Sequence, residues 1–330
     1  MSKLFLTLAF GDYDRTRPLA DGRVQAEGLD LNCAVMTVEE IFHRQAAHAE
    51  FDASEMSLSS YTIARSQGDE RFIAIPIFPS RTFRHSAFWV NPASGIEKAQ
   101  DLVGKRLGVP EYQFTAAIWG RGLLRHEYGI PPEAIRWFQG GQETPGRRER
   151  IPIKIPAGVS VESIGPERTL NAMMEAGELD AVFVTRLPKP YLQGSPHFRR
   201  LFPNYRDVER DYFRRTGVFP IMHTVVIRRE IYDRHPWVAF SLYKAFQRAK
   251  EEAYHDMYES SALKVTLPWL LPEIEETRAL MGEDPWPYGI EPNRKVLSTF
   301  LGYLHEQGLT SRLMTIDELF ARPTVDDFRT

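Results

Sequence analysis

IPIFPSRTFRHSAFWVN, residues Ile75–Asn91, is the stretch from which the fold can be worked out. Two apolar runs, Phe72–Phe78 and Ala87–Val90, are rich in aromatic and β-branched residues and predict two strands. The segment between these runs carries Arg81, Arg84, His85 and Ser86. Guanidinium groups bind carboxylates in bidentate fashion, and imidazole moves protons near neutral pH. The segment therefore predicts an anion site between two strands, with a solvated basic turn as the alternative.

Strands and helices alternate on the N-terminal side of this segment. We expect strands at Leu4–Phe10, Leu29–Met36 and Phe51–Met56. We expect helices at Arg17–Gly22, Val38–Ala49 and Ser57–Arg65. This alternation is typical of a largely parallel sheet covered by helices.

A second unit is expected to begin near Asn91 and Pro92. It contains the following predicted elements: a strand at Arg106–Val109, a ligand loop at Pro110–Gln113, a helix at Phe114–Tyr128, a helix at Thr169–Ala176 and a strand at Ala181–Thr185. Gln139–Pro156 has no apolar periodicity, and we interpret it as a long excursion that forms a lid or an oligomer contact.

The chain then returns to its first unit. After Tyr191 the sequence predicts a strand at Phe219–Ile227 and long helices at Trp237–Met257 and Val296–Glu306. Two crossings between the units imply an α/β fold of two lobes with a hinge and an interlobe cleft. We assign residues 1–90 plus 200–330 to lobe I and residues 91–199 to lobe II.

The composition is that of a globular protein without a charged partner. The 330 residues are 43% hydrophobic and carry a net charge of −3, which gives no reason to expect nucleic acid or an anionic membrane as a partner. Cys33 is the only cysteine, so neither an intrachain disulfide nor a cysteine metal site is possible. No apolar run approaches the ~18 residues of a membrane span. We read Leu4–Phe10 as a strand rather than a secretory signal, and expect a cytoplasmic protein.

Four segments together resemble the 4,5-dihydroxyphthalate decarboxylase family, which has a periplasmic-binding-protein type II-like fold. They are DASEMSLSSY (Asp52–Tyr61), IPIFPSRTFRHSAFWVN, LVGKRLGVPEY (Leu102–Tyr112) and VFPIMHTVVI (Val218–Ile227). The resemblance implies a non-oxidative decarboxylation in phthalate degradation that converts 4,5-dihydroxyphthalate to protocatechuate (3,4-dihydroxybenzoate) and carbon dioxide. It implies an aromatic dicarboxylate as the small-molecule partner. We expect no cofactor, no metal and a homo-oligomer.

That reaction sets three requirements for a site. Direct loss of carbon dioxide would leave an aryl carbanion, so the easier route protonates the ring carbon that bears the departing carboxylate. A hydroxyl para to this carbon supplies electron density. The site then needs cations for the dianion, a general acid near the ring carbon and an acceptor for the hydroxyl proton.

We assign residues to these tasks as follows. The expected catalytic residues are His85, His223 and Glu55, with either histidine as the proton donor. The expected substrate-binding residues are Arg81, Arg84, Ser86, Ser57, Glu111, Tyr112 and Thr224. Most have an ordinary structural alternative: a core histidine, a surface carboxylate or a local cap. Two functional alternatives also stay open: a solute-binding protein for an aromatic carboxylate, and another lyase on the same scaffold.

Overall fold

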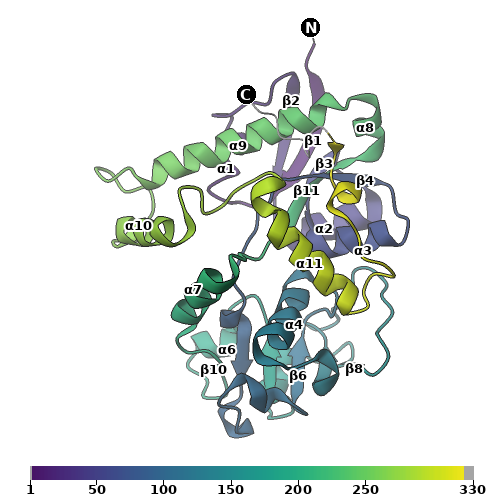
Figure 1. Ribbon diagram of the computed structural model, residues 1–330, viewed down its shortest axis with the longest axis vertical. Helices are drawn as coiled ribbons and strands as arrows, with labels where there is room; N and C mark the ends of the chain where they lie inside the picture. Colours follow the sequence, from purple (N-terminus) through teal and green to yellow (C-terminus); the bar gives the residue numbers. More distant parts are fainter. Residues whose placement is uncertain (1, 323–330) are drawn as a thin grey trace.

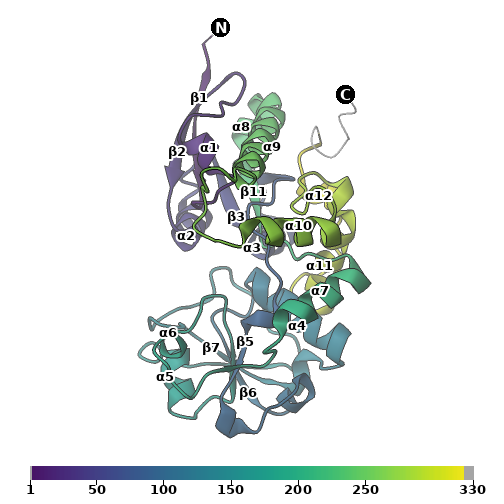
Figure 2. The same cartoon turned by 90° about the vertical axis from the view of Figure 1, so that its left-hand side faces the viewer.

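Two β-sheets form the framework of the computed structural model, which describes residues 2–322 (Figures 1 and 2). The first sheet has the strand order β2-β1-β3-β11-β4. Its strands are β1 (Leu4–Phe10), β2 (Leu29–Val35), β3 (Ala53–Ser57), β4 (Phe72–Ile75) and β11 (His223–Arg228). β1 pairs in parallel with β2 and β3, while β11 runs antiparallel between β3 and β4.

The second sheet has the order β10-β5-β9-β6-β7-β8. Its strands are β5 (Phe88–Val90), β6 (Arg106–Val109), β7 (Arg136–Gln139), β8 (Ser160–Ser163), β9 (Ala181–Phe183) and β10 (Arg199–Arg200). The strands β8, β7, β6 and β9 are parallel, and β5 joins β9 in the antiparallel direction. The alternation of strands and helices thus confirms the expected α/β class.

The helices cover both sheets and fill the space between them (Figures 1 and 2). The α-helices are α1 (Arg17–Ala20), α2 (Val38–His48), α3 (Leu58–Ser66), α4 (Thr115–Tyr128), α5 (Leu170–Glu175), α6 (Lys189–Leu192), α7 (Tyr205–Thr216), α8 (Arg229–Arg234), α9 (Trp237–Met257), α10 (Leu270–Met281), α11 (Arg294–Glu306) and α12 (Ile316–Leu319). Among residues 2–322, no helix has the length and apolarity that crossing a membrane requires.

Two segments cross between the sheets, and they hydrogen-bond to each other. The first runs from the end of β4 at Ile75 to Phe88, and the second precedes β11. The Met222 amide donates to the Ser80 carbonyl at 2.8 Å, and the Thr82 amide donates to the Pro220 carbonyl at 3.1 Å. A paired double crossing of this kind is the hinge that the sequence predicts.

The division into lobes stays a proposal, which the sheets refine at its edges. We propose that each sheet is the centre of one lobe. Because β5 and β10 pair within the second sheet, residues 88–90 and Arg200 then belong to lobe II rather than to lobe I. The strand predicted at Phe72–Phe78 is shorter in the structure. It is β4, and it ends at Ile75 because Pro76 lacks an amide proton and cannot continue the ladder.

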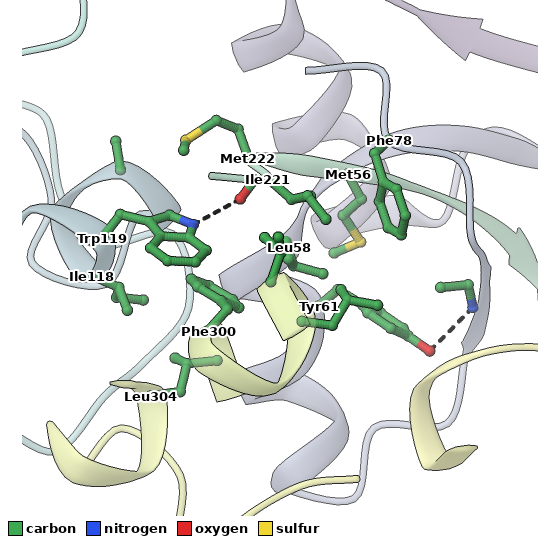
Figure 3. Packing of buried hydrophobic residues seen from close by; sticks show 14 of the residues in the cluster. Met56, Leu58, Tyr61, Phe78, Ile118, Trp119, Ile221, Met222, Phe300 and Leu304 are labelled. Atoms are coloured by element: carbon green, nitrogen blue, oxygen red, sulfur yellow. Dashed lines mark hydrogen bonds between the residues drawn. The ribbon is translucent and has the colours of Figure 1, made fainter. Parts of the chain in front are cut away.

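Helices α11 and α4 pack together where the two lobes meet (Figure 3). The Trp119 ring stacks on Phe300 with centroids 5.3 Å apart, and its Nε1 donates to the Ile221 carbonyl at 2.8 Å. Gly122 allows this close approach, since a Cβ atom there would overlap the ring of Tyr303. One buried cluster thus connects α11, α4 and the hinge.

Candidate active site

A cavity of about 610 Å³ lies between the two sheets. Its walls come from segments far apart in the sequence: Tyr13, Phe42, Ser57 and His223 on the side of the first sheet, Phe114, Thr115, Arg147 and Arg150 on the side of the second, and Ser80, Thr82 and Arg84 in the hinge. Crevices at the ends of strands in open α/β sheets are common ligand sites. This is therefore the candidate active site.

His223 lines the cavity and is held by a buried carboxylate. Its Nδ1 lies 2.6 Å from Oε1 of Glu55, which also accepts a hydrogen bond from the Tyr13 hydroxyl at 2.8 Å. The Gly11 amide donates to Oε2 of Glu55 at 2.9 Å. The register of β3 and β11 sets this pair, because His223 lies opposite Ser57 and its diagonal neighbour on the same face is Glu55.

The charge states of this group follow from its contacts. Burial by itself raises the pKa of Glu55, but the hydrogen bonds from His223, Gly11 and Tyr13 outweigh burial and hold that pKa below its ordinary value. Burial and the adjacent Glu55 charge raise the pKa of the Tyr13 hydroxyl far above its ordinary value. An ionised Glu55 thus accepts the Nδ1 proton of His223 and leaves Nε2 as the ring nitrogen available to a ligand.

Arg84 presents an unpaired cation to the cavity. Among residues 2–322 its guanidinium has no ion-pair or hydrogen-bond partner, and its Nε is buried. Burial lowers the pKa of Arg84 to about 10, so the group remains charged at neutral pH. The carboxylate of Glu209 attracts this partly buried guanidinium without forming an ion pair with it among residues 2–322, so an anionic ligand would supply a direct partner.

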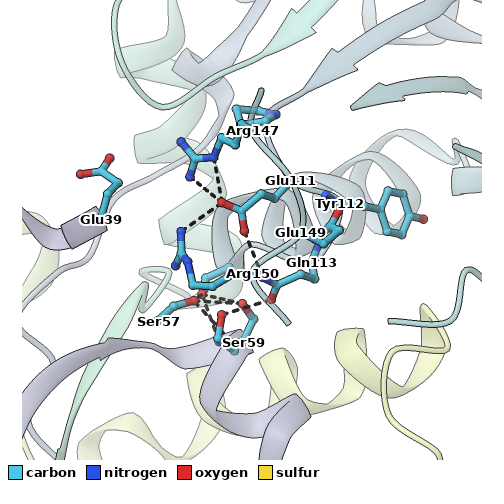
Figure 4. A network of polar contacts seen from close by, with 12 residues as sticks. Glu39, Ser57, Ser59, Glu111, Tyr112, Gln113, Arg147, Glu149 and Arg150 are labelled. Atoms are coloured by element: carbon cyan, nitrogen blue, oxygen red, sulfur yellow. Dashed lines mark hydrogen bonds and ion pairs between the residues drawn. The ribbon is translucent and has the colours of Figure 1, made fainter. Parts of the chain in front are cut away.

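Two further arginines come from the irregular segment 140–159, which joins β7 to β8 (Figure 4). Nε of Arg147 and Nη2 of Arg150 lie 2.8 Å and 3.0 Å from Oε1 of Glu111, and Gln113 donates to Oε2 of Glu111 at 3.0 Å. Glu111 therefore fixes two guanidiniums against the cavity instead of touching a ligand itself. Neither arginine is among the residues predicted from the sequence, although the run Arg147-Arg148-Glu149-Arg150 within a long excursion is a usable signal.

The backbone amides of the predicted ligand loop, Pro110–Gln113, already hold an internal anion. The Glu149 carboxylate accepts hydrogen bonds from the amides of Tyr112 and Gln113 (Figure 4). Burial, together with a smaller effect of the nearby Glu111 charge, raises the pKa of Glu149 to about 7. The loop therefore anchors the arginine segment by its amides, and the excursion is a wall of the cavity.

The other predicted binding residues divide between the cavity and the core. Ser57 lines the cavity, and its hydroxyl lies 3.0 Å from Oγ1 of Thr115 on the opposite lobe. Thr224 is buried and donates to the Ile75 carbonyl at 3.0 Å, because alternation along β11 turns it away from His223. The Tyr112 ring is buried beneath the Arg121 guanidinium, 3.7 Å from its centroid.

The structure does not bring Arg81, His85 and Ser86 into this cavity. Arg81 points to the other side of the hinge, where Nη2 donates to Oδ1 of Asn293. His85 is buried among the rings of Tyr128, Phe202 and Tyr212, and burial lowers its pKa to about 4. The Ser86 amide donates to Glu209 on α7 at 3.1 Å. We therefore withdraw these three residues from the candidate site, because their side chains or amides serve the hinge and the core.

The described residues contain no cluster of three or more His, Cys, Asp or Glu side chains that could hold a metal ion. The expectation that the protein works without a metal or cofactor stays a prediction. The polar groups that line the cavity include guanidiniums, hydroxyls, one imidazole and the carboxylates of Glu39 and Glu143. These can bind an anion and transfer a proton.

Comparison with known proteins agrees with this chemistry. The chain is 42% identical over its full length to the 4,5-dihydroxyphthalate decarboxylase of Comamonas testosteroni, covering 100% of that protein. It is 44% identical over 214 residues to the protein of the same name from Pseudomonas putida. The aligned residues make up 65% of this chain and 83% of that protein. No family model matches the chain.

Solved structures support the fold. The periplasmic aliphatic sulphonate binding protein of Escherichia coli aligns over 98% of this chain and 99% of its own, with a TM-score of 0.54 and 12% identity. A Candida albicans gene product described as having the generic periplasmic binding protein fold aligns over 96% and 93%, with a TM-score of 0.51 and 11% identity. Such low identities establish the two-lobed architecture alone, whereas the full-length relative is informative about family. The chain belongs to the 4,5-dihydroxyphthalate decarboxylase family.

Proposed function

We propose that this protein converts 4,5-dihydroxyphthalate to protocatechuate and carbon dioxide, in the degradation of phthalates. The observation that carries the proposal is the 42% identity to a decarboxylase of that name across the whole of both chains. The cavity supports it independently, because its lining combines cations for a dicarboxylate with an imidazole able to move a proton.

The arginines suit a ligand with two carboxylates. The cavity lining contains four arginines and two glutamates, a surplus of two positive charges before the carboxylate of Glu111 behind it is counted. Among residues 2–322 Arg84 forms no hydrogen bond or ion pair, Arg147 and Arg150 share Glu111, and Arg186 pairs with Glu39. With Glu143 and Glu111 counted, the arginines keep a net surplus of one positive charge. We assign Arg84 to one substrate carboxylate and Arg147 with Arg150 to the other. Planar guanidiniums can also hold a carboxylate turned out of the ring plane.

His223 is the group that we assign to proton transfer. Its protonated imidazole donates the Nε2 proton to the ring carbon that bears the departing carboxylate, while the para hydroxyl supplies electron density. The bond between that carbon and the carboxylate then breaks, its electron pair restores the aromatic ring, and carbon dioxide leaves. His223 regains a proton from solvent, so one proton replaces one carboxylate.

Glu55 and Tyr13 position His223 for this step. The ionised Glu55 accepts the Nδ1 proton at 2.6 Å, which fixes both the tautomer and the direction of the ring. Phe42 packs edge-on against the imidazole with centroids 4.8 Å apart and limits its rotation. Arrangements of this kind lower the cost of reorganisation in the transition state.

Turnover by the purified protein tests the proposed function. Protein mixed with 4,5-dihydroxyphthalate should release one carbon dioxide and form one protocatechuate for each substrate consumed, measured by gas release and chromatography. Phthalate lacks the para hydroxyls and is the control that should remain unchanged. Tight binding of the substrate without product would replace this proposal with the solute-binding protein, and turnover of another carboxylate alone would replace it with a different lyase.

The cytoplasmic location and the homo-oligomeric state expected from the sequence are part of this proposal. Both fit an enzyme that acts on a small aromatic dicarboxylate with neither nucleic acid nor membrane as a partner. Cell fractionation and light scattering of the purified protein test them. Recovery in the periplasmic fraction would contradict the first, and a monomer at micromolar concentration would contradict the second.

A further inference from the structure

Arg81 lines a second cavity, separate from the one that contains His223. This cavity measures about 540 Å³ and lies between the hinge, helices α9 and α11, and the loop before α11. It shares no lining residue with the cavity of His223. The two guanidiniums of the segment Arg81–Arg84 thus face two different spaces.

Arg81 is a buried cation with only neutral partners. Its side chain is 5% exposed, and Nη2 donates to Oδ1 of Asn293 and to the Pro287 carbonyl. Nε has no partner in the described part of the chain, and the guanidinium forms no ion pair there. Burial lowers the pKa of Arg81 to about 9, which still leaves the group charged at neutral pH. Asp284 attracts this ion without forming an ion pair with it in the described part of the chain, so an anionic ligand would supply the direct partner.

The charges around this cavity leave one positive charge uncompensated. Asp284 lines the cavity, but it pairs with the Lys250 ammonium at 2.5 Å and accepts the Tyr254 hydroxyl at 2.8 Å. Glu283 pairs with Arg278. Arg81 therefore remains as the surplus cation, and a monoanion would balance it.

A second polar group in the cavity also has no partner. Tyr288 is 4% exposed, and its hydroxyl is buried without a hydrogen bond among residues 2–322. Aromatic rings and prolines make up much of the remaining wall, including Phe213, Phe219 and Pro285. A guanidinium, an unsatisfied hydroxyl and flat apolar walls together suit a carboxylate attached to a flat apolar body.

We propose that the Arg81 cavity is a second ligand site, which binds a small aromatic monocarboxylate with its carboxylate on Arg81 and Tyr288. The site abuts the hinge, since Arg81 bridges to Ile221 across the two crossing segments. Asn293, which binds Arg81, precedes α11, and α11 packs on α4 of the other lobe. An occupant there contacts the hinge without entering the reaction cavity.

Benzoate binding to the Arg84→Met protein tests this site. Removing Arg84 weakens carboxylate binding in the reaction cavity, where Arg147 and Arg150 remain, so the effect of adding Arg81→Met identifies what binds at the Arg81 site. Calorimetry should show one benzoate per chain, bound at least about tenfold more tightly than the uncharged control benzyl alcohol. Adding Arg81→Met should abolish this preference. Absence of benzoate binding in Arg84→Met, or equal binding after Arg81→Met is added, would overturn the proposal.

A milder variant keeps the test decisive if loss of Arg81 prevents folding. Tyr288→Phe removes only the unsatisfied hydroxyl, so Arg84→Met/Tyr288→Phe should fold and bind benzoate about two- to tenfold more weakly than Arg84→Met. An unchanged dissociation constant would refute the site. These measurements use benzoate alone, so they do not depend on whether the wild-type protein turns over 4,5-dihydroxyphthalate.

Discussion

At the scale of single residues, Arg81 and Arg84 lie three positions apart in the chain and have different roles. Arg84 faces the cavity of His223 and forms no hydrogen bond or ion pair within residues 2–322, whereas Arg81 is turned toward Asn293 on the opposite side of the hinge. The hydrogen bonds between the crossing segments fix this difference, because they set which side chains point to either side. The same residue type therefore carries different predictions at the two positions.

Arg84→Lys should lower kcat/KM for 4,5-dihydroxyphthalate at least about tenfold, a loss of about 1.4 kcal/mol of transition-state stabilisation. A lysine keeps the charge but loses the planar fork that matches a carboxylate. Arg81→Lys is the matched control and should change kcat/KM by less than about threefold, because Arg81 does not line the reaction cavity. Equal losses in the two variants would remove Arg84 from substrate binding.

His223→Gln should lower kcat at least about 100-fold, since general acid catalysis typically contributes about 10²- to 10⁴-fold. KM should change much less, because the arginines rather than the imidazole hold the substrate. Steady-state kinetics of protocatechuate formation measure both constants. His43→Gln, an exposed histidine of α2, is the control with wild-type kinetics. A variant lacking His223 that kept its kcat would show that another group donates the proton.

Sequence patterns located some of these residues and misplaced others for a physical reason. Glu55, Ser57 and His223 lie on regular strands, so they could be predicted because alternation and register fix their direction. Arg81 and His85 lie in the irregular crossing, where no period relates neighbouring side chains. His85 also illustrates a general ambiguity, since an imidazole in an aromatic core and one in a cleft look alike in sequence.

At the scale of elements, the segment 140–159 works as a wall of the cavity because it is tied down twice. Glu111 binds Arg147 and Arg150, and the amides of Tyr112 and Gln113 bind Glu149. The sequence predicted the excursion, since it lacks apolar periodicity, and predicted a ligand loop before α4. It could not show that the anion comes from the excursion itself, because contacts across 36 residues leave no local pattern.

Glu149 makes the stability of this wall depend on pH. Its pKa is about 7 in the folded protein against an ordinary 4.5. Between these pH values the folded protein therefore keeps a proton that the unfolded chain has lost. The contribution of Glu149 to the free energy of unfolding is fully present below about pH 4.5 and is lost as the pH rises through about 7. The wild type should therefore lose melting temperature relative to Glu149→Gln as the pH is raised from about 5 to about 8.

Thermal unfolding across this range checks the dependence on Glu149. Glu162→Gln, on an exposed residue of β8, should give a melting temperature that stays parallel to the wild type at every pH. A wild-type curve that also stayed parallel to that of Glu149→Gln would show that Glu149 titrates normally in the folded protein.

At the scale of the whole molecule, contacts between α4 and α11 connect the two lobes near the hinge. Trp119, Phe300 and Tyr303 form their shared aromatic cluster. Sequence periodicity predicted both helices, but it could not show that they pack on each other. That packing depends on contacts between residues far apart in the chain: Arg121 binds Gln307 at 2.8 Å across a separation of 186 residues. The two-lobed plan could be predicted from the order of elements; this interface could not.

Gly122→Ala should destabilise the protein by about 1–3 kcal/mol, because the added methyl group overlaps Tyr303 and forces the helices apart. Gly302→Ala, on α11, is the control, since a Cβ atom there meets nothing within 4 Å. It should be neutral or stabilising, as alanine favours helix over glycine by up to about 1 kcal/mol. Denaturant unfolding of the two variants compares them, and equal stabilities would contradict the close packing of α4 on α11.

A single turnover in deuterated water tests most directly whether this molecule decarboxylates its substrate by protonating the ring. Excess purified protein is mixed with 4,5-dihydroxyphthalate in D₂O, and the aromatic products are analysed by mass spectrometry and proton NMR. The account predicts protocatechuate with one deuterium, on the ring carbon that lost its carboxylate. Recovery of unchanged 4,5-dihydroxyphthalate, or of protocatechuate without ring deuterium, would contradict it.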